Sequence, residues 1–194
     1  SDIVAYEFAL PPLEEQRRIV TALEHLRVAA DSLLDLRSSA DSVITAVRDR
    51  MLTASWLAGK RASLQSIALG KYGMVDGPFG SNLKSVHFRS SGHPVISSSM
   101  FSTGKFSPGE DDYRFVDSEK FAQLARNRAV GGDILIVLIG FNCGTAAILP
   151  DDHEPGVITQ NCLKITVDPH IARRDFVLET IRWLKDTGRL ERLV

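Results

Sequence analysis

The stretch Gly132-Asp133-Ile134-Leu135-Ile136-Val137-Leu138-Ile139 decides the fold, because a turn leads directly into an unbroken apolar run. A strand with apolar side chains on both faces must be covered from both sides, so a central strand is expected over Ile134 to Ile139. Short apolar runs separated by Gly, Pro, Ser and Asn predict further strands at Pro94 to Ser98, Thr145 to Leu149 and Cys162 to Val167.

Two helices accompany these strands. Ser118 can cap the first, with an inward face made by Phe121, Leu124 and Ala125. The apolar face of the second consists of Phe176, Val177, Thr180, Ile181 and Leu184. Together these elements indicate the α+β class, with a mixed α/β globular domain of about 130 residues over 61–194.

Residues 1–60 have a different composition. All 14 glycines lie at or after Gly59, and no proline occurs between Pro12 and Pro78. Proline suits the start of a helix and glycine its end, so we predict one long helix in this first domain. In a heptad frame from Gln16 to Ala54, ten of the twelve a and d positions are apolar, which is typical of a coiled coil. The residues expected to make the seam with a partner helix are Ile19, Leu23, Leu26, Leu33, Ile44, Val47 and Met51.

Overall composition excludes several classes of protein. The chain has 194 residues, 44% of them hydrophobic, so it can form a sizeable core. Its 23 basic and 24 acidic residues give a net charge of -1, so any case for nucleic-acid binding must be local. Two cysteines are too few for a disulfide scaffold, and no apolar stretch is long enough to span a membrane. We therefore expect a cytoplasmic protein.

Catalytic motifs are incomplete. Gly77 to Lys84 has the glycines of a phosphate-binding loop, but Leu83 occupies the place of the glycine that must precede the lysine. A metal-dependent nuclease would have an acidic ligand two residues before Lys164, where Cys162 stands instead. No dinucleotide-binding glycine motif follows a strand, and the histidines lack metal-ligand spacing. None of these motifs is complete in the sequence, so no metal or other cofactor is expected.

Several segments nevertheless resemble one family, the specificity subunits of type I restriction-modification systems. The segments that carry the resemblance occur in the family's order and cover nearly the whole chain: Pro11 to Val20, Asp76 to Lys84, Gly92 to Ile96, Gly132 to Ile136 and Gly140 to Ala147. The resemblance implies a non-catalytic DNA reader, with a conserved spacer helix in residues 1–60 and a target recognition domain in residues 61–194.

The resemblance also implies partners. A prokaryotic, cytoplasmic specificity subunit binds double-stranded DNA, the DNA methyltransferase (modification) subunits and the restriction subunit. Such subunits usually carry two recognition domains and two conserved helices, whereas this sequence has one of each. A fragment, a truncated gene product and a half-subunit all remain open. Because the single helix lacks its usual partner, we predict a homodimer through Leu13 to Gly59.

Candidate DNA contacts lie in loops and are polar. Lys84 suits a phosphate, serine hydroxyls suit several bases, and asparagine or glutamine can bind adenine through two hydrogen bonds. The acidic segment Glu110 to Asp112 is expected to face away from phosphate. Each candidate could instead stabilise an ordinary turn or a surface ion pair. The residues concerned are Ser81, Asn82, Lys84, Ser97, Ser99, Lys105, Arg114, Asn142, Gln160 and Asn161.

Two other functions stay open. The first is a coiled-coil scaffold or mimic that binds modification subunits without reading DNA. The second is a hydrolase in which Cys143 and His153 form a nucleophilic pair, since such residues meet in space and not in sequence. In the simpler interpretation, Cys143 and Cys162 are small core hydrophobes beside strands.

Overall fold

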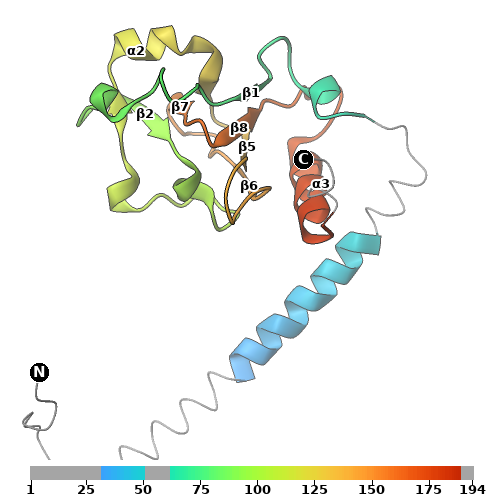
Figure 1. Cartoon of the computed structure of the whole chain (residues 1–194). Coiled ribbons are helices and arrows are strands. Elements are labelled where there is room, and N and C mark those ends of the chain that lie inside the picture. The colour runs from blue at the N-terminus through green and yellow to red at the C-terminus, as the bar shows by residue number, and fades with distance from the viewer. Residues whose placement is uncertain (1–31, 51–61, 189–194) are drawn as a thin grey trace, which may run out of the picture. The chain divides into compact units, whose positions relative to one another are not determined.

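The computed structural model describes residues 32–50 and 62–188, and the chain divides into two compact units, Ser1–Thr53 and Ala54–Val194 (Figure 1). In the first unit, residues 32–50 form one uninterrupted helix. Leu33, Ile44 and Val47 of the predicted seam lie on it and are exposed, so the apolar stripe is present over this stretch. The remaining seam residues, Ile19, Leu23, Leu26 and Met51, lie outside the described residues, as does the expected domain boundary at residue 60. The longer coiled-coil helix therefore stays a prediction.

The second unit contains two four-stranded sheets. In the first sheet every pairing is antiparallel, and its strands follow the order β1 (Met74–Asp76), β8 (Cys162–Ile165), β5 (Ile134–Val137) and β6 (Ala146–Ile148). All four residues of β5 are buried between two neighbouring strands, which confirms the central strand. This strand ends at Val137 and not at Ile139, because the chain turns there and leaves Ile139 66% exposed.

The second sheet is built from shorter strands. Its order is β3 (Phe115–Val116), β2 (His93–Ile96), β7 (Gly156–Ile158) and β4 (Arg128–Ala129), with β2 and β7 parallel and the other pairs antiparallel. The expected strand at Pro94 to Ser98 is present as β2 and stops at Ile96, just before the short helix η4 (Ser98–Phe101). Strands β1, β3, β4 and β7 were not predicted, because two or three residues are too few for a recognisable pattern.

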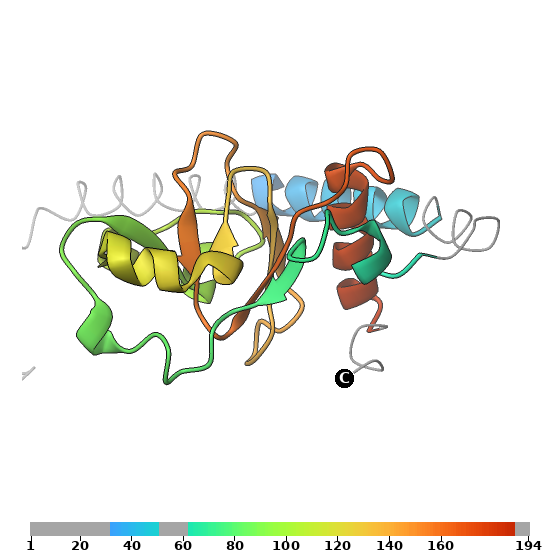
Figure 2. The same ribbon diagram turned by 90° about the horizontal axis from the view of Figure 1, so that it is seen from above.

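Helices cover the outer faces of the two sheets. Both views show α2 (Ser118–Gln123) and α3 (Arg174–Asp186) on opposite sides of the paired sheets (Figures 1 and 2). Alternate residues of β5 accordingly enter different cores. Leu135 and Val137 pack between the sheets with Ile96 and Ile158, whereas Ile134 and Ile136 pack beneath α3 with Val177, Leu178 and Ile181. The α2 side has its own core of Val95, Val116, Phe121, Leu124 and Val157.

The first helix, α2, differs from the prediction at both ends. Its cap is Asp117, whose Oδ1 accepts a hydrogen bond from the Lys120 N–H at 2.9 Å, and Ser118 is the first helical residue. Phe121 and Leu124 are buried as expected. Ala125 is exposed, because the α-helix ends before it and the short helix η6 (Ala125–Asn127) follows.

The second helix, α3, is rotated relative to the predicted face. Val177 and Ile181 are buried as expected, but Phe176 is 52% exposed. Leu178 and Trp183 are buried in addition. The apolar stripe of this helix is therefore centred on Val177, Leu178 and Ile181, about one residue further along the chain than the sequence pattern indicated.

A buried polar cluster connects the start of β5 with β8. Thr166 donates its hydroxyl to Asp133 Oδ1 at 2.6 Å, and Lys164 Nζ donates to Thr166 Oγ1 at 2.9 Å. The Lys164 ammonium lies 3.8 Å from Asp133 Oδ2, and the two side chains are only 8% and 1% exposed. The Val130 N–H donates to Asp133 Oδ2 at 2.9 Å. Burial lowers the pKa of Lys164, and the neighbouring carboxylate partly offsets this effect.

Candidate nucleic-acid interface

Three loops leave the first sheet at the same end of its strands. In the ladder, Asp76 at the end of β1 pairs with Leu163, and Val137 at the end of β5 pairs with Cys162, the first residue of β8. The start of β6 pairs with Ile136. The segments 77–84, 138–145 and 159–161 therefore emerge side by side, and we call these three segments the loop edge.

Close backbone contacts hold the loop edge together. The Gly77 N–H donates to the Cys162 carbonyl at 2.8 Å, and the Leu138 N–H donates to the Asn161 carbonyl at 2.8 Å. A Cβ at Gly77 would lie 1.8 Å from the Thr159 carbonyl oxygen, so only glycine permits this approach. Segments 77–84 and 138–145 thus flank the turn 159–161 on its two sides.

The second sheet brings another predicted segment to the same end of the fold. Strands β2 and β7 are parallel, so they finish together, and the Thr159 N–H donates to the Ile96 carbonyl at 3.0 Å. Ser97 follows directly after Ile96 and is half-buried. The serines 97–99 therefore lie next to the loop edge, on the side of the second sheet.

The structure brings most of the predicted amides and hydroxyls together. Ser81, Asn82 and Gln160 are exposed on the loop edge, and Asn142 and Asn161 are half-buried there. Gln160 Oε1 lies 2.6 Å from where a Cβ at Gly80 would stand, so this side chain reaches across to the neighbouring loop. These five side chains come from all three segments and offer hydrogen-bond donors and acceptors to a ligand at this edge.

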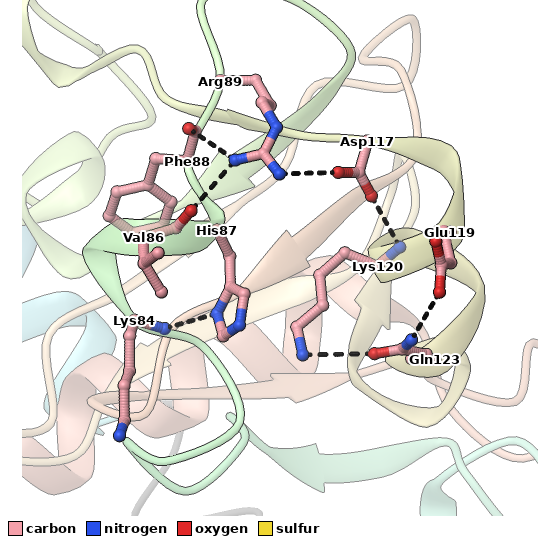
Figure 3. A network of polar contacts seen from close by, with 9 residues as sticks. All are labelled: Lys84, Val86, His87, Phe88, Arg89, Asp117, Glu119, Lys120 and Gln123. Carbon is pink, nitrogen blue, oxygen red and sulfur yellow. Dashed lines mark hydrogen bonds and ion pairs between the residues drawn. The ribbon is translucent and has the colours of Figure 1, made fainter.

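Lys84 is the only charged residue of the loop edge. Its backbone N–H donates to His87 Nδ1 at 3.0 Å, and the His87 N–H donates back to the Lys84 carbonyl at 2.9 Å. Among the described residues, its ammonium group has no hydrogen-bond or ion-pair partner, and Figure 3 shows it pointing away from the neighbouring polar groups. Lys84 is therefore available to bind an anion such as phosphate.

The neighbouring arginine has a structural role instead. Arg89 donates to the carbonyls of Val86 and Phe88 at 3.0 and 3.1 Å, and it forms an ion pair with Asp117 at 3.0 Å (Figure 3). The pKa of Asp117 is lowered, first by the Lys120 N–H and then by Arg89. This network ties the segment after Lys84 to the start of α2.

Ser99 is bound by the acidic segment Glu110 to Asp112, which was expected to face away from phosphate. Its hydroxyl donates to Asp112 Oδ1 at 2.6 Å and lies 2.7 Å from Ser97 Oγ. Asp112 also accepts from the Gly109 N–H at 2.8 Å, and these two hydrogen bonds lower its pKa, with that from Ser99 as the larger cause. A carboxylate beside the serines disfavours phosphate, so the candidate interface is centred on the loop edge and not on residues 97–99.

The two remaining predicted cations lie at the periphery. One guanidinium nitrogen of Arg114 donates to the carbonyls of Asp111 and Tyr113, both at 2.8 Å, so this side chain helps to shape the acidic segment. Lys105 is exposed in the loop that follows η4. The preceding residue, Gly104, accepts a hydrogen bond from Arg182 of α3 at 2.7 Å, which holds that loop beside the first sheet.

Three features of this region were not found from the sequence. Phe79 and Phe141 are 81% and 105% exposed and lie on two different segments of the loop edge. Each stands next to a glycine in a turn, and this placement outside any apolar run is the signal that could have marked them. Arg126 lies in η6 next to Asn127, whose amide donates to the Asp76 carbonyl at 2.8 Å. Only the fold brings that arginine near the end of β1.

The hydrolase alternative is wrong in its geometry. Cys143 lies in the β5–β6 hairpin before β6 begins, and His153 lies beyond the other end of that strand. The Cys143 thiol donates to the Leu138 carbonyl at 3.0 Å, and His153 Nδ1 is 2.6 Å from the Glu154 carbonyl. Cys143 is exposed, whereas Cys162 is buried and burial raises its pKa to about 11. The two thiols are thus not both core residues.

Residues 32–50 and 62–188 contain neither a metal-binding cluster nor a membrane-spanning helix. No group of three or more His, Cys, Asp or Glu side chains in these ranges could hold a metal ion. No helix in the same ranges is both long and apolar enough to cross a membrane.

Solved structures share this fold. The chain matches the HsdS subunit from Thermoanaerobacter tengcongensis with a TM-score of 0.53 and 18% identity, over 92% of this chain and 43% of that one. It also matches a chain from a study of complex assembly and conformational transition of the type I R-M system, with a TM-score of 0.52 and 19% identity, over 90% and 42%. The expected resemblance to type I specificity subunits is thereby confirmed at the level of the fold.

The likeness to these subunits is one of fold. No family model and none of the curated proteins compared matches the sequence. The chain spans less than half of the length of either solved structure. The activity and the partners of a whole specificity subunit are therefore proposals for this chain.

Proposed function

We propose that this chain is a non-catalytic specificity module of a type I restriction-modification complex and reads one half of a bipartite double-stranded DNA target. The observation that carries the proposal is the loop edge, where three segments present uncharged hydrogen-bonding side chains together with Lys84. Phosphate contacts position a DNA-binding protein and base contacts give it specificity. The loop edge has the residue types for both tasks.

The side chains divide naturally between these tasks. Lys84 binds a backbone phosphate, and Arg126, in η6 close to the end of β1, can bind a second one. Asn142, Gln160 and Asn161 contact base edges in the major groove, where an amide can make two hydrogen bonds to adenine. Ser81 and Asn82 supply further donors and acceptors from the loop after β1.

The charges at the opposite end of the first sheet also favour the loop edge as the DNA-binding end. The exposed carboxylates of Asp151, Asp152 and Glu154 lie beyond the end of β6. Arg174 neutralises Asp151 through two hydrogen bonds of 2.5 and 2.7 Å and, mainly through them, lowers the pKa of that carboxyl. The other two carboxylates would repel a phosphate backbone, so the loop edge is the favoured end for DNA.

A reader with so few free cations on and around its loop edge should bind DNA weakly by itself. Each phosphate contact makes the slope of log affinity against log salt more negative by about 0.9. With Lys84 and Arg126 as the phosphate contacts, we expect a slope of about -2 for the isolated chain. The modification subunits then supply much of the affinity of the complex.

The first unit provides the protein contacts of this proposal. Residues 32–50 form a helix with an exposed apolar stripe that contains Leu33, Ile44 and Val47. Such a stripe requires a partner helix, either from a second copy of the chain or from a modification subunit. We propose a homodimer through the long helix, with modification and restriction subunits assembled around it. A strict monomer at micromolar concentration in light scattering would argue against the dimer.

The decisive experiment is co-expression with the accompanying modification subunit, followed by genome-wide mapping of methylated bases. A split methylated motif is expected, and Gln160→Ala should relax the sequence requirement at one base pair of one half of the motif. The matched control is Gln65→Ala, an exposed glutamine of the short helix η2 (Gln65–Ile67) that leads into the opposite end of the first sheet. A stable complex that methylates no specific motif would instead support the scaffold or mimic that binds modification subunits without reading DNA.

A further inference from the structure

Two phenylalanines of the loop edge make no contribution to the core. Phe101 and Phe121 are buried, but Phe79 and Phe141 project into solvent from segments 77–84 and 138–145. Burying a phenylalanine stabilises a fold by about 1.5 to 3 kcal/mol, and neither of these rings provides that gain. Their positions are therefore more informative about a ligand than about folding.

Hydrogen-bonded turns fix the backbone at both phenylalanines. Around Phe141, the Cys143 N–H donates to the Gly140 carbonyl at 3.0 Å, and the Gly144 N–H donates to the Val137 carbonyl at 2.8 Å. Gly140 has φ +100°, which places the ring at a sharp corner of the hairpin. At the other loop, the Asn82 N–H donates to the Phe79 carbonyl at 2.7 Å. The rings are presented by ordered turns, as a rigid contact residue must be.

The surroundings indicate the chemistry of the partner. Segment 138–145 contains no charged residue, and the polar side chains of the loop edge are mainly amides, hydroxyls and Lys84, with the exposed carboxylate of Asp76 just before it. A protein-binding surface is usually apolar at its centre, with a polar rim. Isolated rings among hydrogen-bonding groups match DNA better, because aromatic side chains insert at base steps or contact thymine methyl groups.

The spacing of the loops fits a duplex. Strands β1 and β5 are separated by β8, and adjacent strands are roughly 4.8 Å apart. The points where the two loops leave the sheet are therefore about 10 Å apart. This separation corresponds to about three base-pair rises of 3.4 Å. The two phenylalanines can therefore address different base pairs of one half-site.

We propose that Phe141 acts as an apolar wedge that partly unstacks one base step of the DNA half-site, and that Phe79 contacts bases about three pairs away. This inference rests on the proposed function, since it assigns a role within the same interface. A wedge favours steps that unstack easily, such as TA and CA. Phe141 would thereby contribute specificity without any hydrogen bond to a base.

The test uses the complex of the full chain with its modification subunit and a duplex that carries the mapped target. The duplex contains 2-aminopurine, whose fluorescence rises when a base unstacks, at successive positions of the half-site other than the methylated base, which a methyltransferase itself takes out of the stack. We expect a rise at one step with the unaltered chain and with Phe141→Leu, which keeps an apolar wedge. Phe141→Ala should abolish the rise and weaken binding about tenfold. Phe176→Ala is the control, because Phe176 is an exposed phenylalanine of α3.

The outcomes separate the two proposals. Specific binding without a fluorescence rise at any position, or an unchanged rise with Phe141→Ala, overturns the wedge and leaves the proposed function intact. An equal loss of binding with Phe141→Leu and Phe141→Ala also overturns it, since a wedge needs apolar bulk and not an aromatic ring. Failure of the complex to select any DNA motif overturns the proposed function and the wedge together.

Discussion

Replacing Asp133 by asparagine should destabilise the second unit in a pH-dependent way. The change keeps the size of the side chain but removes its negative charge. Among the described residues, Asp133 is the only ion-pair partner of Lys164. The Lys164 side chain is only 8% exposed, so water does not readily replace the lost partner. The variant must bury an unpaired charge or release the proton of Lys164.

Release of that proton sets an upper limit to the penalty. Deprotonating a lysine with an ordinary pKa of 10.5 costs about 1.4 kcal/mol for each pH unit below that value. The limit is therefore about 5 kcal/mol at pH 7 and about 2 kcal/mol at pH 9. Because the unfolded chain binds a proton that the folded variant lacks, the stability of Asp133→Asn rises with pH through this window.

Urea denaturation at pH 7 and pH 9 measures the effect as the difference between variant and unaltered protein. The control is Lys164→Met, which leaves Asp133 with hydrogen bonds from Thr166 and Val130 and no lysine to titrate. We expect a penalty for the control that does not fall between pH 7 and pH 9, because this variant has no lysine that can release a proton. A penalty for Asp133→Asn that is below about 1 kcal/mol at pH 7, or equal at both pH values, would refute the reasoning.

Three further predictions concern the interface. Gly77→Ala should cost about 1 to 3 kcal/mol in urea denaturation, because the added Cβ would lie 1.8 Å from a carbonyl oxygen of the adjacent turn; an unchanged midpoint contradicts that contact. Iodoacetamide should modify Cys143 quickly and Cys162 only on unfolding, since burial raises the Cys162 pKa to about 11; mass spectrometry distinguishes the two sites. Ser99→Ala should raise the lowered pKa of Asp112 toward 3.8, which NMR titration measures. In the unaltered protein the lowered pKa stabilises the fold above pH 3.8, and this stabilisation is lost as the pH falls through the folded pKa. The variant should lose part of that stabilisation.

The sequence predicts long, well-patterned elements and misses short ones. The run from Ile134 identifies β5 as the central strand, because six successive apolar residues need cover on both faces. The two-residue strands β3 and β4 carry no such pattern and exist only because β2 and β7 lie beside them. The rotation of α3, which exposes Phe176 and buries Trp183, is likewise decided by the sheet it covers.

The candidate site was predicted by residue type but not by arrangement. Asn142 and Gln160 are 18 positions apart in the sequence, and only the antiparallel pairing of β5 with β8 brings their loops together. Ser99 is an apparent DNA contact in the sequence, yet its hydroxyl is bound by Asp112, 13 positions further along. Long-range pairing of this kind leaves no local signal.

The connection between β5 and β6 has a consequence for how such a domain can diverge. The two strands are adjacent and antiparallel, and β5 is also fixed by β8, so their register does not depend on the segment 138–145 that joins them. Lengthening a surface loop costs little free energy, so insertions and deletions there are tolerated. The turn 159–161 lacks this freedom, since its three residues join strands of different sheets. If the proposed function holds, new target preferences should therefore arise first through the hairpin that carries Phe141, while Gln160 stays on a turn of fixed length.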